Sequence, residues 1–325
     1  GRCNEVEASL VPTRADPHPG PVITPSVMLR FSRPHTIVGT VVSIAALYTI
    51  VCDRAQEGHP LLLASALLVG IACNLFIVGI NQVADVEIDR INKPYLPLPA
   101  GDLSPHQAMM IVRTALIMAL SVALVVSPWL FLVVGTATFI GWAYSMPPFR
   151  LKRHHLKAAI AISTVRGLLI NLGGFMAYDH LANGHVVVPM EVWLLTGFIT
   201  AFSICIAWFK DLADVPGDAL HGIRTLAVSH SPRSALIAGH VLVAVAYLAT
   251  ILLLWLHAQS AIVDVLRTWV LLIGHGVLFI SFMVNMLSVR LDRTESVKRF
   301  YTRFWVFFFA EYILFLIAYL LPVHP

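Results

Sequence analysis

Two groups of oxygen-bearing side chains stand where long apolar stretches give way to polar loops. The first is Asn81-x-x-x-Asp85-x-x-x-Asp89, and the second is Asp211-x-x-Asp214-x-x-x-Asp218. If each apolar helix runs on into its loop, the last two aspartates of a group project from one helical face. Carboxylates placed this way repel each other, so a cation between them would be stabilising. Hard oxygen ligands favour Mg²⁺, which often shares its coordination shell with substrate phosphates.

The loop after the first group adds a cation and a stiff backbone. It reads RINKPYLPLPAGD over residues 90–102. Its three prolines are expected to stop any helix, and Lys93 offers a point charge to a phosphate. A loop at headgroup level with snorkelling cations is the alternative for this segment taken alone. Its nearness to the aspartates favours a phosphate site.

The loop around the second group matches the first almost residue for residue and indicates an internal repeat. We expect Pro216 and Gly217 to break the helix inside this group, which would let Asp218 leave the helical face. Arg224, six residues further on, is a candidate phosphate ligand. A magnesium diphosphate would satisfy both kinds of residue, because metal pairs with carboxylates and phosphate with cations.

A third loop on the same side reads YSMPPFRLKR over residues 144–153. Tyr144 is suited to hydrogen-bond a phosphate or to cover a cation with its ring. Arg150 and Lys152 are candidate phosphate ligands. For Arg153 and Lys157 we prefer the alternative, positive charge at a membrane interface.

Polar residues also occur inside or next to the apolar stretches. Arg166 and Asn171 lie within the fifth stretch, where an ionisable group is costly and indicates a functional site unless the two form a buried structural pair. Arg33 and His35 precede the first stretch on the side of the aspartates. A lone histidine is usually structural, but this site needs a group that binds an acidic acceptor or shuttles a proton. We therefore count these four residues as candidate substrate ligands.

The elements that must position these residues are membrane helices. Hydrophobic residues make up 58% of the 325 residues and charged residues only 12%, which is typical of an integral membrane protein. Apolar runs of this length without alternation of period two are helices. The nine expected spans are 36–52, 60–84, 105–126, 128–144, 157–178, 190–209, 233–256, 264–289 and 301–321. The expected fold is therefore an all-α bundle of nine transmembrane helices.

The distribution of basic residues supports this topology. The chain has 22 lysines and arginines. In a topology of nine spans, 18 of them lie on the same membrane face as the N-terminus, and two, Arg54 and Arg267, lie on the opposite face. Arg113 and Arg166 lie inside spans. The positive-inside rule then puts the N-terminal face, which carries both Asp groups, toward the cytoplasm or its organelle equivalent. No basic face carries interleaved aromatic residues, so nothing indicates a nucleic-acid partner.

The chain divides into a tail and one polytopic domain. Residues 1–28 hold five prolines and no apolar run, so we expect a disordered tail there and a single domain over residues 29–325. A start at Gly1 is consistent with a precursor whose targeting segment is removed or not included.

Both Asp motifs, in the contexts NQVADVEIDRINKPYLPLPAG and KDLADVPGDALHGIRTLAV, resemble those of the UbiA superfamily of intramembrane prenyltransferases. RPHTIVGT and YSMPPFRLKR are similar to the plastid homogentisate prenyltransferase branch. Within that branch, TVRGLLINLGG at 164–174 resembles the solanesyltransferases more than the phytyltransferases. The resemblance implies an enzyme of a plastid membrane, with its active face on the stromal side.

The resemblance also implies site roles and a reaction. Asn81, Asp85 and Asp89 would hold one Mg²⁺ and Asp211, Asp214 and Asp218 a second, bridged by the diphosphate of an allylic prenyl donor. The cations expected to neutralise the departing diphosphate are Lys93, Arg150, Lys152, Lys210 and Arg224. The ring of homogentisate would attack the allylic cation, with decarboxylation, in a step of plastoquinone biosynthesis.

Several alternatives stay open at this stage. Within the family they are a homogentisate phytyl- or geranylgeranyltransferase of tocopherol or tocotrienol biosynthesis, a 4-hydroxybenzoate prenyltransferase and a chlorophyll synthase. A membrane transporter is the rival from another class, because carriers also show repeats and intramembrane charges. Carrier sites usually lie near the bilayer midplane, whereas these acids gather at one face. A scaffold gives no reason for two matched acidic groups. The sequence names no protein partner.

Overall fold

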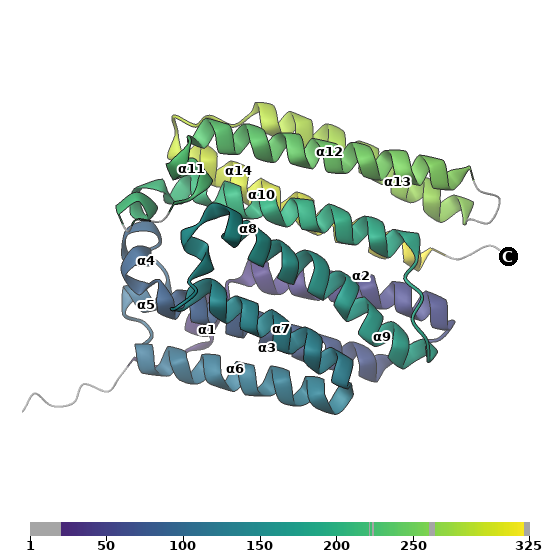
Figure 1. Ribbon diagram of the computed structural model, residues 1–325, viewed down its shortest axis with the longest axis horizontal. Helices are drawn as coiled ribbons and strands as arrows, with labels where there is room; N and C mark the ends of the chain where they lie inside the picture. Colours follow the sequence, from purple (N-terminus) through teal and green to yellow (C-terminus); the bar gives the residue numbers. More distant parts are fainter. Residues whose placement is uncertain (1–20, 221, 223, 260–263, 322–325) are drawn as a thin grey trace, which may run out of the picture.

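A computed structural model describes residues 21–220, 222, 224–259 and 264–321. Across these residues the chain is helical, without a β-strand, and its helices run side by side in one bundle (Figure 1). The predicted all-α class is confirmed.

The nine predicted spans are confirmed in the described residues as nine helices long and apolar enough to cross a membrane. They are α2 (Pro34–Ala55), α3 (Pro60–Ala84), α6 (Pro105–Val126), α7 (Pro128–Ser145), a continuous segment of α8 (His155–Ser163), η2 (Thr164–Gly173) and α9 (Gly174–Asn183), α10 (Met190–Leu220), α12 (Pro232–Ala258), α13 (Val265–Leu287) and α14 (Thr294–Leu320). The shorter helices are α1 (Pro25–Ser32), α4 (Val86–Asn92), α5 (Pro97–Ala100), η1 (Leu151–Arg153) and α11 (Leu226–Ser229).

Proline and short polar residues set where the helices begin. Seven helices, α1, α2, α3, α5, α6, α7 and α12, have proline in their first turn, where its missing N–H costs no hydrogen bond and its fixed φ suits the helix. Ser104 forms a reciprocal capping box with Gln107 at the start of α6. Pro97 thus starts a one-turn helix in a loop whose prolines we expected to stop any helix.

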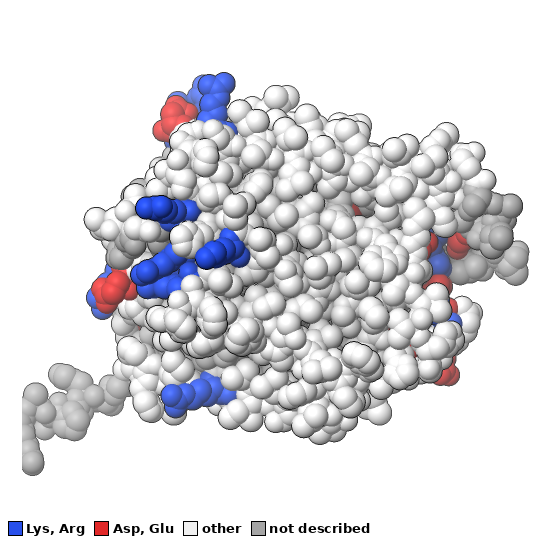
Figure 2. Space-filling model, viewed as in Figure 1, with Lys and Arg blue, Asp and Glu red and all other residues white. Residues whose placement is uncertain are grey.

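Helix α10 lies at the centre of the bundle and the short helices lie at one end of it. Two thirds of the spanning window of α10 is buried, against 22–39% for the other eight spans. Helices α12, α13 and α14 form one edge of the view in Figure 1 and α6 the other, while α4, α5 and α11 cluster at the left end. Figure 2 shows lysine and arginine gathered toward this end and a wide uncharged belt beside it. The two Asp motifs are therefore brought to one end of the bundle.

An aromatic core packs the part of α10 that contains Phe202 and Phe209 against the last three spans. Phe202 stacks on Phe304, with ring centroids 4.1 Å apart and planes 7° from parallel. Phe209 meets the edges of Phe300 and Phe304 at 5.1 and 4.8 Å. These buried rings favour stacked and edge-to-face pairs because of their quadrupoles. They hold the helix that carries the second Asp motif.

Two expectations about helix ends differ from the structure. Helix α10 continues to Leu220 through Pro216 and Gly217, so the expected helix break there is wrong. Packing of α10 against α4, α11 and α12 overrides the local preference of these residues. Helix α1 begins at Pro25, inside the segment 1–28 that we expected to be disordered. Residues 1–20 of that segment lie outside the described residues.

Candidate active site

A polar pocket opens at the end of the bundle where the two Asp motifs meet. Its lining comes from four spanning segments and the loops and short helices between them. The polar lining residues are Arg33, Asn81, Asp85, Asp89, Asn92, Lys93, Tyr144, Lys152, Lys210, Asp211 and Thr225. Four of them are cations and three are carboxylates. The pocket therefore brings together carboxylates and cations, the residue types that the sequence analysis assigns to a metal ion and to an anion.

Asp85 is the centre of one half of the pocket. Helix α3 ends at Ala84, and Asp85, with φ −112° and ψ 12°, joins it to α4. Lys152 Nζ donates a hydrogen bond to Asp85 Oδ1, and Arg150 Nη2 lies 3.9 Å from the same oxygen. Asn81 Nδ2 donates to Asp85 Oδ2 at 3.1 Å. The third loop is therefore held against the first Asp motif.

Asp89 is the centre of the other half. The backbone N–H of Asp89 donates to the carbonyl oxygen of Asp85 at 2.7 Å, so the two carboxylates stand on successive turns although α3 does not run on. Lys93 Nζ lies 3.8 Å and Arg33 Nη2 3.9 Å from the Asp89 carboxylate. Asp89 is only 4% exposed. Burial raises the pKa of Asp89, and the charges of Lys93 and Arg33 partly oppose that rise.

Lys152 is a cation with almost no exposed surface. Burial lowers the pKa of Lys152 to about 8, against the opposing pull of Asp85. Charged side chains are rarely buried unless they are paired. A buried lysine at the wall of a polar pocket indicates a site that receives a strong anion.

Two of the cations lie on an unusual backbone. Arg33 joins α1 to α2 with φ 51°, and Arg150 precedes η1 with φ 40°. Non-glycine residues rarely adopt this left-handed conformation, which costs of order 1–3 kcal/mol and clusters at functional sites. Both residues approach the motif aspartates. The two cations are therefore placed near the aspartates at the cost of local backbone strain.

The second Asp motif is described in part. Lys210 and Asp211 line the polar pocket opposite the first motif. Asp214 and Asp218 lie in α10, but their side chains fall outside the described residues. The first motif fits a divalent metal, because the buried Asp89 Oδ2 has no hydrogen-bond partner among the described residues and the Asp85 carboxylate and the Asn81 side-chain amide line the same pocket. No cluster of three or more acidic, histidine or cysteine ligands occurs in the described part of the chain, so metal binding would rest on mixed ligands and phosphate oxygens.

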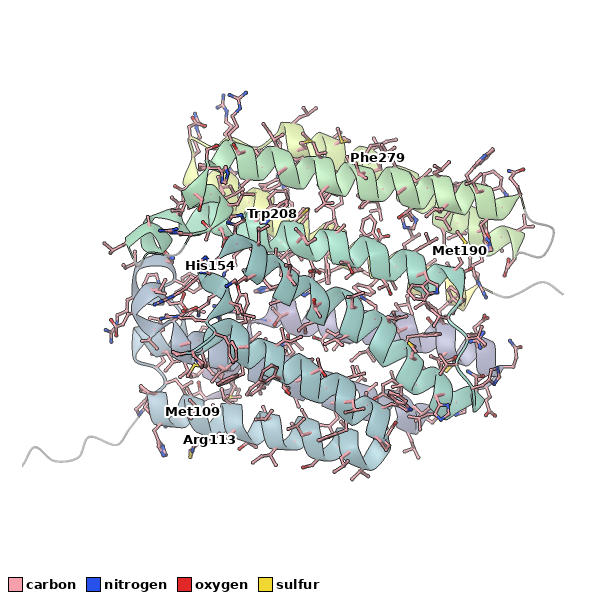
Figure 3. The ribbon with its side chains drawn as sticks, viewed as in Figure 1. Met109, Arg113, His154, Met190, Trp208 and Phe279 are labelled. Carbon is pink, nitrogen blue, oxygen red and sulfur yellow. The ribbon has the colours of Figure 1, made fainter. Side chains whose placement is uncertain are left out.

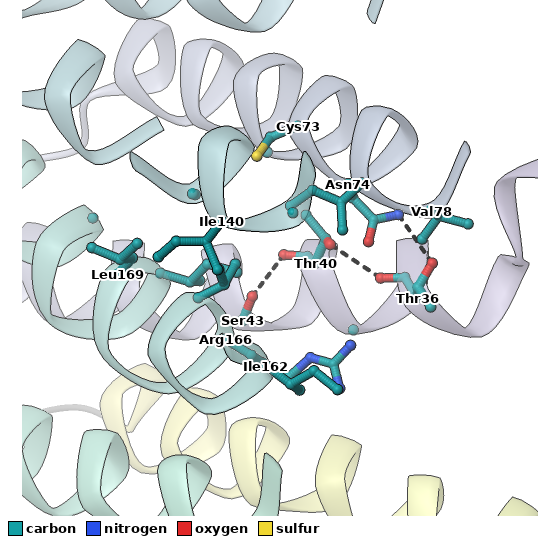
Figure 4. Close-up of a pocket in the computed structure, with 18 of the residues that line it drawn as sticks. Thr36, Thr40, Ser43, Cys73, Asn74, Val78, Ile140, Ile162, Arg166 and Leu169 are labelled. Carbon is teal, nitrogen blue, oxygen red and sulfur yellow. Dashed lines mark hydrogen bonds between the residues drawn. The ribbon is translucent and has the colours of Figure 1, made fainter. Parts of the chain in front are cut away.

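An apolar cavity of about 270 Å³ lies in the bundle directly behind the polar pocket. We call it the main cavity. Its walls are mostly aliphatic, with Cys73, Ile140, Ile162 and Leu169 among the lining residues labelled in Figure 4. Five residues line both the main cavity and the polar pocket: Arg33, Asn81, Tyr144, Ala207 and Lys210. These shared residues form the boundary between a charged compartment and an apolar one.

A buried cation faces the main cavity from η2. The guanidinium carbon of Arg166 lies 5.0 Å from the ring centroid of Trp305 and 5.6 Å from that of Phe308, which is cation–π geometry. Its Nη1 is buried and has no hydrogen-bond partner in the part of the chain that the structure describes. His35, also in the cavity wall, meets the Trp305 ring edge-on at 4.9 Å. The cavity therefore offers a donor to an anion.

A polar stripe runs along α2 on another wall of the main cavity. Asn74 Nδ2 donates to Thr36 Oγ1 at 3.0 Å, Thr40 Oγ1 to the Thr36 carbonyl at 3.0 Å, and Ser43 Oγ to the Thr40 carbonyl at 2.9 Å (Figure 4). Because hydroxyls can both donate and accept, this wall suits a hydroxyl-bearing ring better than a purely aliphatic wall would.

The structure places two predicted ligands elsewhere. Asn171 is not among the described residues that line the polar pocket or the main cavity. Its Nδ2 donates to the carbonyls of Arg166 and Gly167 at 3.0 and 2.9 Å, and its Oδ1 accepts from the Tyr312 hydroxyl at 2.8 Å. It satisfies backbone groups of the wide-turned η2, and this structural role removes it from the substrate ligands. It does not form the buried pair with Arg166 that we gave as the alternative, since only the Arg166 backbone is bound.

The side chain of Arg224 is exposed and does not line the polar pocket. Its backbone N–H donates to Arg153 O at 2.9 Å, and its carbonyl accepts from His155 N at 3.2 Å, next to His154 at the end of the bundle (Figure 3). Arg224 therefore joins two loops and does not share the pocket of the described motif aspartates, Asp85, Asp89 and Asp211. Arg113 is exposed on the outer side of α6, as expected of a snorkelling residue (Figure 3).

Sequence reasoning missed Asn92, Tyr301 and Trp305. Asn92 lines the polar pocket, and Tyr301 and Trp305 line the main cavity. The signal for the last two was an aromatic run at helical spacing, Tyr301, Trp305 and Phe308 in the last span. Such a run normally indicates core packing, so only its approach to Arg166 identifies it as part of the site.

The chain is similar to known membrane enzymes. The UbiA prenyltransferase family matches residues 39–310. Homogentisate phytyltransferase of Synechocystis sp. is 39% identical over 299 residues, which cover 90% of this chain and 95% of the relative. Homogentisate solanesyltransferase of Arabidopsis thaliana, a chloroplastic protein, is 34% identical, with 88% and 75% covered. The structure of a UbiA homolog from Archaeoglobus fulgidus bound to GPP and Mg²⁺ has a TM-score of 0.59 at 18% identity, covering 90% of this chain and 99% of the other.

Proposed function

Since this chain belongs to the UbiA prenyltransferase family, in its homogentisate prenyltransferase branch, we propose that it transfers a prenyl group from an allylic prenyl diphosphate to homogentisate. The observation that carries this proposal is the shared boundary of the polar pocket and the main cavity. A prenyl diphosphate has a multiply charged anionic end and an apolar tail, and these two compartments match its two ends. The transporter alternative is set aside, because the family is one of enzymes.

The charged end of the donor binds in the polar pocket. Lys93, Lys152 and Lys210 line the pocket and Arg150 stands behind Asp85, so all four can neutralise phosphate oxygens. A divalent metal supports this binding, as in the solved homolog with GPP and Mg²⁺. When bound, such a metal would supply positive charge to the leaving diphosphate. We propose one Mg²⁺ at Asn81, Asp85 and Asp89 and a second at Asp211, Asp214 and Asp218.

The bond that breaks joins the first tail carbon to the diphosphate oxygen, and its electron pair leaves with the diphosphate. An allylic cation remains at the boundary of the two compartments. Tyr144 lines that boundary, and the face of its ring is suited to stabilise a cation. The aliphatic walls of the main cavity exclude water, which would otherwise capture the cation.

The acceptor binds in the main cavity beside Arg166. Homogentisate carries a carboxylate, and Arg166 offers a buried Nη1 without a hydrogen-bond partner in the described residues. A carboxylate would remove the cost of this unpaired buried donor. His35 and the Thr36 hydroxyl, in the same wall, are within the region where the ring hydroxyls would lie.

The ring carbon forms a bond to the allylic cation and loses its proton. The carboxylate leaves as CO₂, its bonding electrons stay on the methylene carbon, and that carbon takes up a proton to become a methyl group. Before decarboxylation, the guanidinium of Arg166 binds the carboxylate of homogentisate. The products are a prenylated methylhydroquinone, diphosphate and CO₂.

For the donor we propose solanesyl diphosphate, supported by the resemblance of residues 164–174 to solanesyltransferases. Phytyl diphosphate is the second candidate, because the Synechocystis phytyltransferase is 39% identical over nearly the whole chain. We also propose a plastid membrane, in line with the chloroplastic plant relatives, with the polar pocket on the stromal face as the basic residues indicate.

The test is turnover of the lipid-reconstituted protein with Mg²⁺, homogentisate and a panel of phytyl, geranylgeranyl and solanesyl diphosphates. Preference for solanesyl diphosphate supports a role in plastoquinone synthesis, and preference for phytyl diphosphate supports one in tocopherol synthesis. Absence of product with every donor, in a protein that still binds Mg²⁺ and a prenyl diphosphate, would contradict homogentisate as the acceptor.

A further inference from the structure

A second apolar space lies beyond the main cavity, on the side away from the polar pocket. We call it the distal chamber; its volume is about 50 Å³. Helix α3 gives the order of the compartments: Asn81 lines the polar pocket, Ala66 lines both the main cavity and the distal chamber, and Leu62 lines only the chamber. At 1.5 Å per residue, these positions span about 28 Å, close to the thickness of a bilayer core.

The main cavity and the distal chamber meet at a narrow boundary. The residues that line both are Ile44, Ala66, Ile170, Gly174 and Tyr178. Three of them are bulky, and Gly174 is the smallest. A Cβ built on Gly174 would meet only a backbone oxygen of its own helical turn, Leu169 O at 3.8 Å. The space that a side chain would fill there is therefore empty.

The neighbouring glycines behave differently. A Cβ on Gly173 would lie 3.1 Å from Val133 Cγ2, and one on Gly70 would lie 2.5 Å from Ile44 Cδ1. These two glycines permit close packing of helices. Gly174 has ordinary helical dihedrals, φ −65° and ψ −47°, so neither backbone conformation nor packing requires glycine at this position. The missing side chain leaves open space where the main cavity and the distal chamber share their lining.

We propose that Gly174 keeps the main cavity open to the distal chamber, and that the chamber receives the far end of the prenyl tail of long donors. The proposal rests on the proposed function, because that function places the diphosphate in the polar pocket and directs the tail along α3. A short tail ends within the main cavity. A long tail has to pass Gly174, so this passage contributes to the selection of donor length.

The apolar wall beyond the passage fits this occupant. Leu47, Val51 and Phe175 line the chamber and are almost fully buried. Polar atoms make up very little of its surface, which suits a hydrocarbon chain and no charged ligand. The chamber shares lining residues with the main cavity, and the main cavity shares lining residues with the polar pocket.

The experiment compares Gly174→Leu with the wild-type protein and with Gly197→Leu as a matched control. Gly197 is an exposed helical glycine of α10 with open space around its Cβ position, and it lines none of the three compartments. Each protein is reconstituted in lipid with Mg²⁺ and homogentisate, and kcat/KM is measured for geranyl, geranylgeranyl and solanesyl diphosphates. We expect Gly174→Leu to lower the ratio of long-donor to short-donor kcat/KM roughly tenfold or more, the effect typical of a few misplaced methylene groups.

A milder variant and a second readout guard against misfolding. Gly174→Ala should change the same ratio in the same direction by a smaller factor. Competition binding of the three donors without acceptor should show the loss of long-donor affinity directly. An unchanged ratio in both variants, or equal losses for every donor, would overturn the proposal. Wild-type protein that binds donors yet does not prenylate homogentisate would contradict the proposed acceptor instead, and the binding ratio would still test Gly174.

Discussion

Lys152 and Asp85 form a buried ion pair across 67 residues of sequence, and it joins η1 to the start of α4. The pair places a cation and a metal-ligand candidate on the same wall of the polar pocket. Because Asp85 also contacts Asn81 and Arg150, the carboxylate is fixed from several directions. Donor binding should therefore depend on the protonation of Lys152.

Turnover with the prenyl donor should fall as pH rises through about 8. Burial lowers the pKa of Lys152 to about 8, so the amine is charged below this pH and becomes neutral above it. Neutral Lys152 no longer attracts the diphosphate, so kcat/KM for the donor decreases on the alkaline side. Lys152→Arg keeps a charge at all accessible pH values and should remove this alkaline limb. If kcat/KM of Lys152→Arg falls with rising pH as it does in the wild type, the alkaline decrease belongs to another group.

The requirement for Mg²⁺ should increase on the acid side. The raised pKa of Asp89 means that this carboxyl takes up a proton at a higher pH than an ordinary aspartate. Protonated Asp89 cannot ligate a cation, so half-activation by Mg²⁺ should need more metal as pH falls through that pKa. Asp89→Asn should lose turnover by roughly 100-fold or more and lose this pH dependence. Titration of activity with Mg²⁺ at several pH values measures both effects, with Glu87→Gln, an exposed neighbour, as the control.

Arg166→Met should weaken binding of the acceptor and leave binding of the donor unchanged. A charged hydrogen bond is worth about 1.5–3 kcal/mol, so kcat/KM for homogentisate should fall roughly 10- to 100-fold while KM for the donor changes little. The methyl ester of homogentisate supplies the matched substrate: wild-type protein should prefer the acid, and Arg166→Met should lose that preference. Equal losses for acid and ester would show that Arg166 supports the fold and does not hold the carboxylate.

Arg267→Ala should destabilise the end of the bundle far from the polar pocket. Arg267 forms two hydrogen bonds with Asp53, at 3.0 and 2.8 Å, and its guanidinium lies 4.0 Å from the ring centroid of Tyr319. Loss of these charged hydrogen bonds should cost about 1.5–3 kcal/mol. Arg90→Ala, which removes an exposed pair with Glu87, should cost under ~1 kcal/mol. Thermal unfolding in one detergent compares the two, and similar shifts would contradict the assignment.

Gly167→Ala should loosen η2 from α10. The added Cβ would lie 2.2 Å from Thr200 Oγ1 and 2.8 Å from Thr200 Cα, so backbone has to move, at a cost of about 1–3 kcal/mol. Gly197→Ala in α10 meets open space and should stabilise the helix by up to about 1 kcal/mol. Opposite signs of the change in unfolding temperature are the expected result. A neutral Gly167→Ala would show that the close approach of the two helices is not required.

The spans and the position of the Asp motifs could be predicted from the sequence because both depend on local properties. Hydropathy over about 20 residues identifies a span, and basic loops identify the face to which Asp85 and Asp211 belong. The convergence of Lys93, Lys152 and Lys210 on one pocket followed from the same topology. These predictions needed only the order of the helices and no side-chain geometry.

The rest depends on tertiary packing. The continuation of α10 through Pro216 is set by its neighbours, and local preference favours a break there. Asn171 has a side chain suited to bind a ligand, yet its amide group binds the backbone carbonyls of Arg166 and Gly167 within the wide-turned η2. Arg224 lies near the second motif in sequence, but its backbone pairing with Arg153 directs the side chain outward. The proximity of Trp305 to Arg166 joins segments 139 residues apart, and no local pattern predicts it.

The shared boundary of Arg33, Asn81, Tyr144, Ala207 and Lys210 has a consequence for the order of events. A donor that fills the polar pocket and the main cavity at once closes the way between them. An acceptor arriving from water must therefore enter before the donor, whereas one arriving from the bilayer can enter after it. In the proposed reaction the prenylated product carries neither the carboxylate of the acceptor nor the diphosphate of the donor, so no charge would retain it. Lateral departure into lipid is then the natural exit, and the diphosphate leaves separately into water.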